Sequence, residues 1–243
     1  MKLCYFGDAQ SIHVQKWCTY FSCIGNEVHL ISFRKAEIPN VQVHYINIGL
    51  INVSGRNWKA LLKFFKIRKL LKRINPDVFH AHYATSYGIT AALVNFHPFV
   101  ISVWGSDLLI TPKKSIIIKK MLKWAFKRCD SVTVVADHMT SSLLSLKVPI
   151  EKIRVITHGI DVELFKKTEN PKNKEFTVVC TRNLETVYNH KQLFDGFAKA
   201  LKKTPEINLL VIGDGSLRRK LNDYSKEIGI NKSKMNIIGR LTS

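Results

Sequence analysis

Short apolar stretches alternate with longer amphipathic stretches along almost the whole chain. The short ones are typical of buried β-strands, and the longer ones repeat apolar residues every three or four positions, as a helix with one buried face does. A first helix is predicted from Val14 to Ile24, with Gly25 where a helix-ending glycine belongs. Strands are predicted over 3–6, 27–33, 41–48, 78–82, 99–103, 131–136, 153–156, 176–181, 207–212 and 236–238, and helices over 57–74, 86–96, 116–129, 137–146, 190–203 and 217–228.

This alternation predicts an α/β fold, because strands separated by helices pair in parallel and form a doubly wound sheet. The rhythm breaks between Thr157 and Lys174, where a polar run containing Pro171 follows His158 and Gly159. We therefore expect a first domain over 1–165, a linker over 166–174 and a second domain over 175–243. The last predicted strand is followed by no helix, so we expect the second domain to be incomplete.

The five cysteines favour a reducing compartment. Their number is odd, no two have the spacing of a metal-binding or redox pair, and four lie in apolar segments. The apolar stretch at the amino end stops at Gly7 and is too short for a signal peptide. The longest apolar run, 88–105, is interrupted by Asn95, His97 and Pro98, so no membrane span is predicted. We expect a cytoplasmic protein.

Charge is the unusual feature of the composition. The chain has 38 Lys and Arg residues against 18 Asp and Glu residues, a formal net charge of +20. Such a surface favours anionic partners: nucleic acid, lipid headgroups or phosphorylated substrates. Two predicted helical segments, Arg56 to Arg73 and Lys113 to Arg128, contain no acid and hold eight and seven of the basic residues.

Two interpretations of these basic segments remain open. Each has an apolar face, which holds Trp58, Leu61, Leu62 and Phe65 in one segment and Met121, Leu122, Trp124 and Ala125 in the other. Each segment could pack on the sheet and present lysines to solvent. Alternatively, both could dock on an anionic membrane, where each basic residue near the surface contributes ~1 kcal/mol.

Candidate binding residues lie where predicted parallel strands end, which is where ligands bind in such sheets. Gly213, Asp214, Gly215 and Ser216 connect a strand to a helix, so backbone amides there could hold a phosphate. The third glycine of a dinucleotide-binding fingerprint is absent, since Arg218 stands in its place. A tight turn without a ligand is the competing interpretation.

Two cations lie at the preceding strand end. Arg182 follows its strand directly, and Lys191 opens the next helix. Such a pair suits a diphosphate, although a solvated surface pair is the alternative. His80 and His82 share one face of a strand, but no nearby Cys or His completes a metal site. We predict buried or cleft-lining histidines and no metal.

Seven segments, in order and at the expected spacing, resemble motifs of the retaining GT-B glycosyltransferases of family 4. They are Gly25 to Ile31 (GNEVHLI), Asp77 to His82 (DVFHAH), Val103 to Asp107 (VWGSD), Ile156 to Phe165 (ITHGIDVELF), Cys180 to Leu184 (CTRNL), Leu210 to Leu217 (LVIGDGSL) and Ile237 to Gly239 (IIG). The resemblance covers essentially the whole chain. It implies two Rossmann-like doubly wound parallel sheets, the second incomplete.

The resemblance also implies a reaction: transfer of a sugar from a nucleotide-sugar donor to a glycan or lipid-linked acceptor, with retention and without a cofactor or metal. Cell-envelope polysaccharide or lipopolysaccharide synthesis is the expected process, at the inner face of the membrane if the basic segments dock there. The first domain would bind the acceptor, and the second the donor. The expected cleft residues are Gly7, His82, Trp104 and Asp107, and the expected donor-binding residues are Arg182, Lys191, Gly213, Asp214, Gly215 and Ser216.

The chain departs from the family pattern in several places. Gly7 is followed by Asp8 and Ala9 rather than by a second glycine, and Trp104 stands where many members have a histidine. The family's Lys-Gly pair after the arginine is replaced by Val187 to His190, and the E-x7-E element of the family would lie beyond Ser243. A truncated non-catalytic fragment is therefore one alternative. A basic nucleic-acid-binding protein is another, but no helix-turn-helix, zinc or RRM signature supports it, so we expect no nucleic-acid partner.

Overall fold

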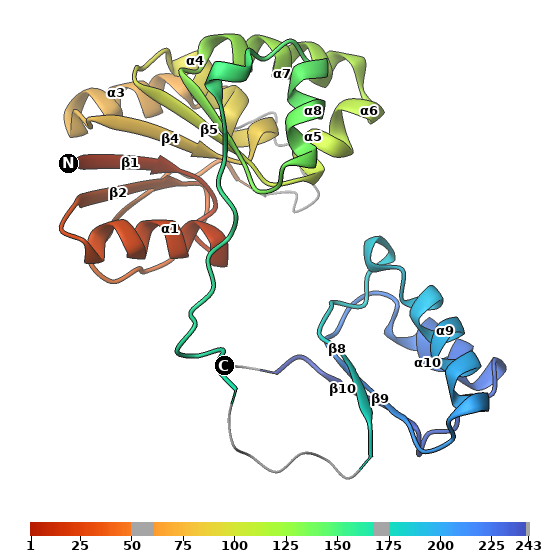
Figure 1. Cartoon of the computed structure of the whole chain (residues 1–243). Helices are drawn as coiled ribbons and strands as arrows, with labels where there is room; N and C mark the ends of the chain where they lie inside the picture. The colour runs from red at the N-terminus through yellow and green to blue at the C-terminus, as the bar shows by residue number, and fades with distance from the viewer. Residues whose placement is uncertain (50–60, 168–174, 242–243) are drawn as a thin grey trace. The chain divides into compact units, whose positions relative to one another are not determined.

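The computed structural model describes residues 1–49, 61–167 and 175–241. They form two compact units, Met1–Asp161 and Val162–Ser243, each built on a parallel sheet (Figure 1). The predicted α/β class with two parallel sheets is confirmed. Residues 168–174 lie outside the described residues, so the linker over 166–174 and the exact domain bounds stay predictions.

The sheet of the first unit has, among the described residues, seven parallel strands in the order β3-β2-β1-β4-β5-β6-β7. The strands are β1 Lys2–Phe6, β2 Glu27–Ser32, β3 Gln42–Tyr45, β4 Val78–His82, β5 Phe99–Val103, β6 Ser131–Val134 and β7 Ile153–Val155. The direction of strand addition reverses between β1 and β4, which pair in parallel with Phe6 opposite Ala81. Ligands of doubly wound sheets bind outside the carboxyl ends of strands at such a switch point.

Helices cover both faces of this sheet. They are α1 Ile12–Cys23, α3 Phe64–Ile74, α4 Ile89–Val94, α5 Ser106–Leu109, α6 Thr111–Lys114, α7 Ile116–Arg128 and α8 His138–Ser145, with a π-turn at Ala84–Gly88 and a 3₁₀ turn at Ile150–Lys152. Figure 1 shows α3, α4 and α7 on one face and α1 on the other. Two hydrophobic cores separate accordingly, the larger one under α3, α4, α7 and α8.

The second unit has, among the described residues, a three-stranded parallel sheet in the order β10-β9-β8. Its elements are β8 Thr177–Cys180, a 3₁₀ turn at Thr186–Tyr188, α9 His190–Lys203, β9 Asn208–Ile212, α10 Arg218–Glu227 and β10 Met235–Gly239. Phe194, Phe197 and Leu221 from the two helices pack on Leu209 and Val211 of β9.

Several predicted elements are shorter than expected. The strand expected over 41–48 stops at Tyr45 because its partner β2 ends at Ser32, directly opposite. The helix expected over 86–96 is instead the π-turn followed by α4, and it stops before Asn95, which is left-handed with φ 57°. The helix expected over 57–74 includes α3, while residues 57–60, with Trp58, lie outside the described residues.

Other differences concern the first helix and two short helices. Ile24 was expected on the buried face of the first helix, but α1 ends at Cys23 and Ile24 is exposed. Gly25 has φ 87° and stops the helix as predicted. The short helices α5 and α6 were not predicted, because four residues are too few to show a helical period.

Candidate functional site

Three of the four predicted cleft residues of the first unit lie at the carboxyl edge of its sheet. Gly7 follows β1, His82 ends β4, and Trp104 follows β5. A Cβ atom on Gly7 would lie 3.2 Å from Cβ of His82 and 3.0 Å from Cγ2 of Val14. Only glycine allows β1, β4 and α1 to approach this closely without displacing these neighbours.

A stack of imidazole and indole rings extends from the interior to the surface at this edge. The ring of His80 lies 4.4 Å from that of His82, which lies 5.4 Å from Trp104. Trp104 in turn stacks on His13 and on His158, at 5.0 Å each. The sequence did not single out His13 or His158 as site residues. His13 lies in the first turn of α1, the helix that follows β1, and this position near a strand end is the signal that could have found it.

The rings of this stack are uncharged near neutral pH. Burial lowers the pKa of His80 to about 3. It also lowers the pKa of His82 well below its ordinary value, and those of His13 and His158 to a smaller extent. Among the described residues, the two ring nitrogens of His82 have no hydrogen-bond partner. Neutral rings suit an uncharged, hydroxyl-rich molecule better than an anion.

Asp107, the fourth predicted cleft residue, is buried and acts on the loops around it. Its carboxylate accepts hydrogen bonds from the backbone amides of Ala84 at 2.7 Å, Gly105 at 2.9 Å and Trp104 at 3.1 Å. Burial raises its pKa, and these amides act in the opposite direction. Asp107 therefore joins the segments after β4 and β5 and holds the backbone of Trp104.

In the second unit, the loops that follow β8 and β9 pack directly on each other. A Cβ atom on Gly213 would lie 2.4 Å from the carbonyl oxygen of Arg182, and one on Gly215 would lie 2.5 Å from that of Leu184. Both distances are shorter than any real Cβ contact, so these positions require glycine. The structure thus brings Arg182 and the loop from Gly213 to Ser216 together, as their positions at neighbouring strand ends predicted.

Most amides of this loop, however, are already occupied, which corrects the expectation of free donors at the start of α10. Four of the five backbone amides from Gly213 to Leu217 have an acceptor within the unit. The pairs are Gly213 N with Gly239 O at 2.7 Å, Gly215 N with Asp214 Oδ1 at 2.8 Å, Ser216 N with Glu185 Oε1 at 2.9 Å and Leu217 N with Leu184 O at 3.0 Å.

Glu185 is a site residue that the sequence analysis missed. Its carboxylate accepts from both the amide and the hydroxyl of Ser216, the latter at 2.7 Å. These two bonds lower the pKa of Glu185, so the carboxylate is ionised at neutral pH. A ligand phosphate could use Ser216 only after Glu185 moves away. No local sequence pattern marks this residue, since the contact joins two loops 31 positions apart.

The two predicted cations differ in their surroundings. The guanidinium of Arg182 lies 5.6 Å from the ring centre of Tyr188 and, among the described residues, forms no ion pair. Lys191 bonds to the carboxylate of Asp195 at 3.0 Å and to the hydroxyl of Tyr224, and these contacts raise its pKa. Within the described ranges, Lys191 has no hydrogen bond or ion pair with Arg182 or with 213–216. Arg182 is therefore the cation available to an anionic ligand.

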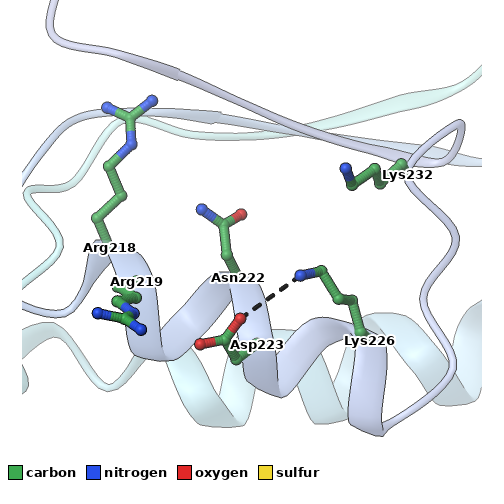
Figure 2. A pocket seen from close by; sticks show the side chains of 6 residues that line it. All are labelled: Arg218, Arg219, Asn222, Asp223, Lys226 and Lys232. Atoms are coloured by element: carbon green, nitrogen blue, oxygen red, sulfur yellow. Dashed lines mark hydrogen bonds and ion pairs between the residues drawn. The ribbon is translucent and has the colours of Figure 1, made fainter.

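A separate hollow of about 520 Å³ lies along α10 (Figure 2). It is lined by Arg218, Arg219, Asn222, Asp223, Lys226 and Lys232. Lys226 reaches Asp223 at 3.5 Å, and Arg218 is held by Asp214 at 3.0 Å. None of the predicted donor-binding residues lines it. In the part of the chain that the structure describes, no cluster of His, Cys, Asp or Glu could hold a metal ion.

Comparison with solved structures shows the same fold in longer chains. The structure of Alr3699/HepE from Anabaena in complex with UDP and glucose matches with a TM-score of 0.76 and 14% identity, covering 100% of this chain and 70% of that chain. The lipopolysaccharide outer core galactosyltransferase WaaB matches with a TM-score of 0.68 and 17% identity over 100% and 69%. A glycosyltransferase from Rickettsia africae matches with a TM-score of 0.69 and 16% identity over 99% and 68%.

No curated protein sequence matches this chain. Two family profiles do. The profile of the glycosyl transferase group 1 family matches residues 161–242. The profile described as glycosyl transferase 4-like matches residues 2–136, more than half of the chain. The chain therefore belongs to the glycosyl transferase 4-like family, with a GT-B type first unit followed by a group 1 type second unit.

Proposed function

We propose that this protein transfers a sugar from a nucleotide-sugar donor to a glycan or lipid-linked acceptor with retention of configuration. The observation that carries the proposal is the guanidinium of Arg182, which has no ion pair among the described residues and lies at the carboxyl edge of the second sheet. The family assignment supports the same chemistry. So do the fold neighbours from Anabaena, whose structures contain UDP with glucose or UDP-glucose.

On the donor side, Arg182 would hold the diphosphate. Negative charge builds on the diphosphate as its bond to the sugar breaks, and a guanidinium meets that charge with two parallel hydrogen bonds. Gly213 and Gly215 fix the position of Arg182 because their loop packs against its carbonyl oxygen and that of Leu184. Asp214 and Ser216 belong to the same loop. The ammonium of Lys191 would have to leave Asp195 and Tyr224 before it could bind the donor.

On the acceptor side, the ring stack around Trp104 would receive the sugar acceptor. His13 and His158 are its exposed members, and Gly7 and His82 lie behind it. Neutral imidazoles can donate to and accept from sugar hydroxyls, while an indole ring covers the apolar face of a pyranose. Asp107 would contribute by holding the Trp104 loop. We place the reaction in cell-envelope polysaccharide or lipopolysaccharide synthesis, on the cytoplasmic side of the membrane.

Arg182→Ala should weaken the binding of UDP about tenfold or more. A charge-assisted hydrogen bond contributes roughly 1.5–3 kcal/mol, and 1.4 kcal/mol corresponds to a factor of ten in affinity. Isothermal titration calorimetry with UDP, GDP and ADP measures the effect and ranks the nucleotides.

Lys191→Ala is the matched control, since it removes one cation from the same unit. It should change the affinity for UDP much less, because Lys191 is paired within the protein. If Lys191→Ala loses binding while Arg182→Ala does not, the diphosphate lies on the other cation. If the parent chain binds none of the three nucleotides, the proposal that it uses a nucleotide-sugar donor is contradicted.

A further inference from the structure

The outer surfaces of α3 and α7 carry positive charge that no acid compensates. In α3, Lys66, Arg68, Lys69, Lys72 and Arg73 are exposed, and in α7 and the short α6 before it Lys113, Lys114, Lys119, Lys120 and Lys127 are exposed. None of these side chains forms an ion pair with a described residue. The segments 61–74 and 111–128 contain no Asp or Glu, so the charge is a property of the whole surface.

Both helices lie on the same face of the sheet. α3 and α7 flank the short α4, and all three contribute to the larger hydrophobic core (Figure 1). The side of α3 that faces the sheet is apolar, and its Ile67, Leu71 and Ile74 are buried. The cations therefore project from the opposite side of the helix. We call the outer surface formed by 61–73 and 113–127 the basic face.

Large apolar side chains are exposed among these cations. Leu62, two residues before α3, is 76% exposed, and Phe65 in the first turn of α3 is 69% exposed. At the start of α7, Ile116 is 71% and Ile117 62% exposed. Trp124 is also exposed, one helical turn beyond Lys120. Side chains of this size usually pack inside a protein, and mixing them with lysines is typical of a helix that lies on a lipid surface.

The starts of both helices lie toward the edge of the sheet that carries the ring stack. α3 ends four residues before β4 begins and α7 three residues before β6, so the end of each helix lies near the amino ends of the strands. Each helix therefore runs antiparallel to the strands, and its start lies near their carboxyl ends. Leu62, Phe65, Ile116 and Ile117 are thus on the Trp104 side of the unit. Among the described residues, no helix is long and apolar enough to cross a bilayer.

We propose that the basic face docks the first unit on an anionic lipid bilayer, with the lysines on the headgroups and Leu62, Phe65, Ile116 and Ile117 inserted between them. The charge favours an anionic surface, and the exposed apolar side chains favour lipid over nucleic acid. Acyl chains bury such side chains directly, whereas a duplex admits them only where its bases are unstacked and the helix is kinked. The proposal deepens the proposed function: docking in this orientation brings the acceptor edge next to the lipid surface.

Vesicle co-sedimentation tests the proposal, with phosphatidylcholine vesicles that contain 30% phosphatidylglycerol and with pure phosphatidylcholine vesicles. The protein should bind the anionic vesicles and be released by 0.5 M NaCl. Each lysine near the surface changes partitioning about fivefold, so a triple variant of α3 should bind about a hundredfold more weakly. The α3 variant is Lys66→Ala, Lys69→Ala and Lys72→Ala; the matched control in α9 is Lys199→Ala, Lys202→Ala and Lys203→Ala.

The control should bind vesicles much more like the parent, although it loses the same charge. Phe65→Ala tests insertion separately and should weaken binding about tenfold. Equal losses in the α3 and α9 variants, or equal binding to both kinds of vesicle, would overturn the proposal. If the α3 variant lost binding to duplex DNA but bound vesicles as well as the parent does, the basic face would be assigned to nucleic acid. UDP affinity should be the same in all these variants, so a failure of docking is distinguishable from a failure of the donor site.

Discussion

Gly213→Ala should destabilise the second unit by about 3 kcal/mol or more. The added Cβ atom would lie 2.4 Å from the carbonyl oxygen and 3.0 Å from the carbonyl carbon of Arg182, and neither backbone atom can rotate away. Gly213 also has φ 155°, a conformation that residues with a side chain rarely adopt. The relevant measurement is urea denaturation followed by the amide resonances of α9 and β9, which report on this unit alone.

Gly196→Ala is the matched control, because it adds the same methyl group to the same unit. Gly196 lies inside α9, and a Cβ atom there would meet nothing within 4 Å. Alanine should therefore stabilise the helix by about 0.5–1 kcal/mol. Opposite signs for the two variants would establish that the loops after β8 and β9 are in contact. If both variants had parent-like stability, the loops would not pack as described.

Acid should destabilise the first unit well before its carboxylates are protonated. Buried His80 and His82 stay neutral in the folded chain because their pKa values are lowered, to about 3 for His80. In the unfolded chain both take up a proton below about pH 6.5. Their contribution to stability is therefore fully present above that pH and is lost as the pH falls, by about 1.4 kcal/mol per pH unit for each histidine.

Between pH 7 and pH 5 the two histidines together should remove about 4 kcal/mol from the free energy of unfolding. Urea denaturation across this range measures the slope, and ¹⁵N chemical shifts of the imidazoles show directly whether the rings stay neutral. His82→Asn should reduce the slope by roughly half, whereas substitution of the exposed His138 by Asn should leave it unchanged. A free energy of unfolding that is constant from pH 7 to pH 5 would contradict neutral burial of this pair.

The order of strands and helices could be read from the sequence because the apolar pattern differs in period between them. The strand over 78–82 and the helix over 190–203 were predicted at their observed bounds. The exact ends of other strands depend on where the neighbouring strands of the sheet end. Tyr45 ends β3 only because β2 ends opposite it, and nothing within 41–48 signals that limit.

The candidate sites were predictable only as strand ends. Parallel pairing brings Arg182 next to Gly213, so sequence position was enough to place these two together. The acceptor of the Ser216 amide was not predictable from the sequence, because Glu185 lies in a different loop, 31 positions earlier in the chain. For the same reason the stacking of His13 and His158 on Trp104, which joins segments more than 140 residues apart, needed the structure.

The central claim is that the loops after β8 and β9 bind the diphosphate of a nucleotide-sugar donor. The most direct measurement is a titration of the ¹⁵N-labelled chain with UDP, followed by the backbone amide resonances and the Nε resonance of Arg182. We expect the largest shifts at Arg182, at Glu185 and at 213–216, since the phosphate would approach Arg182 and the carboxylate of Glu185 would leave Ser216. Shifts confined to Arg219, Lys226 and Lys232 in the hollow along α10, or no shifts in the second unit at all, would contradict the claim.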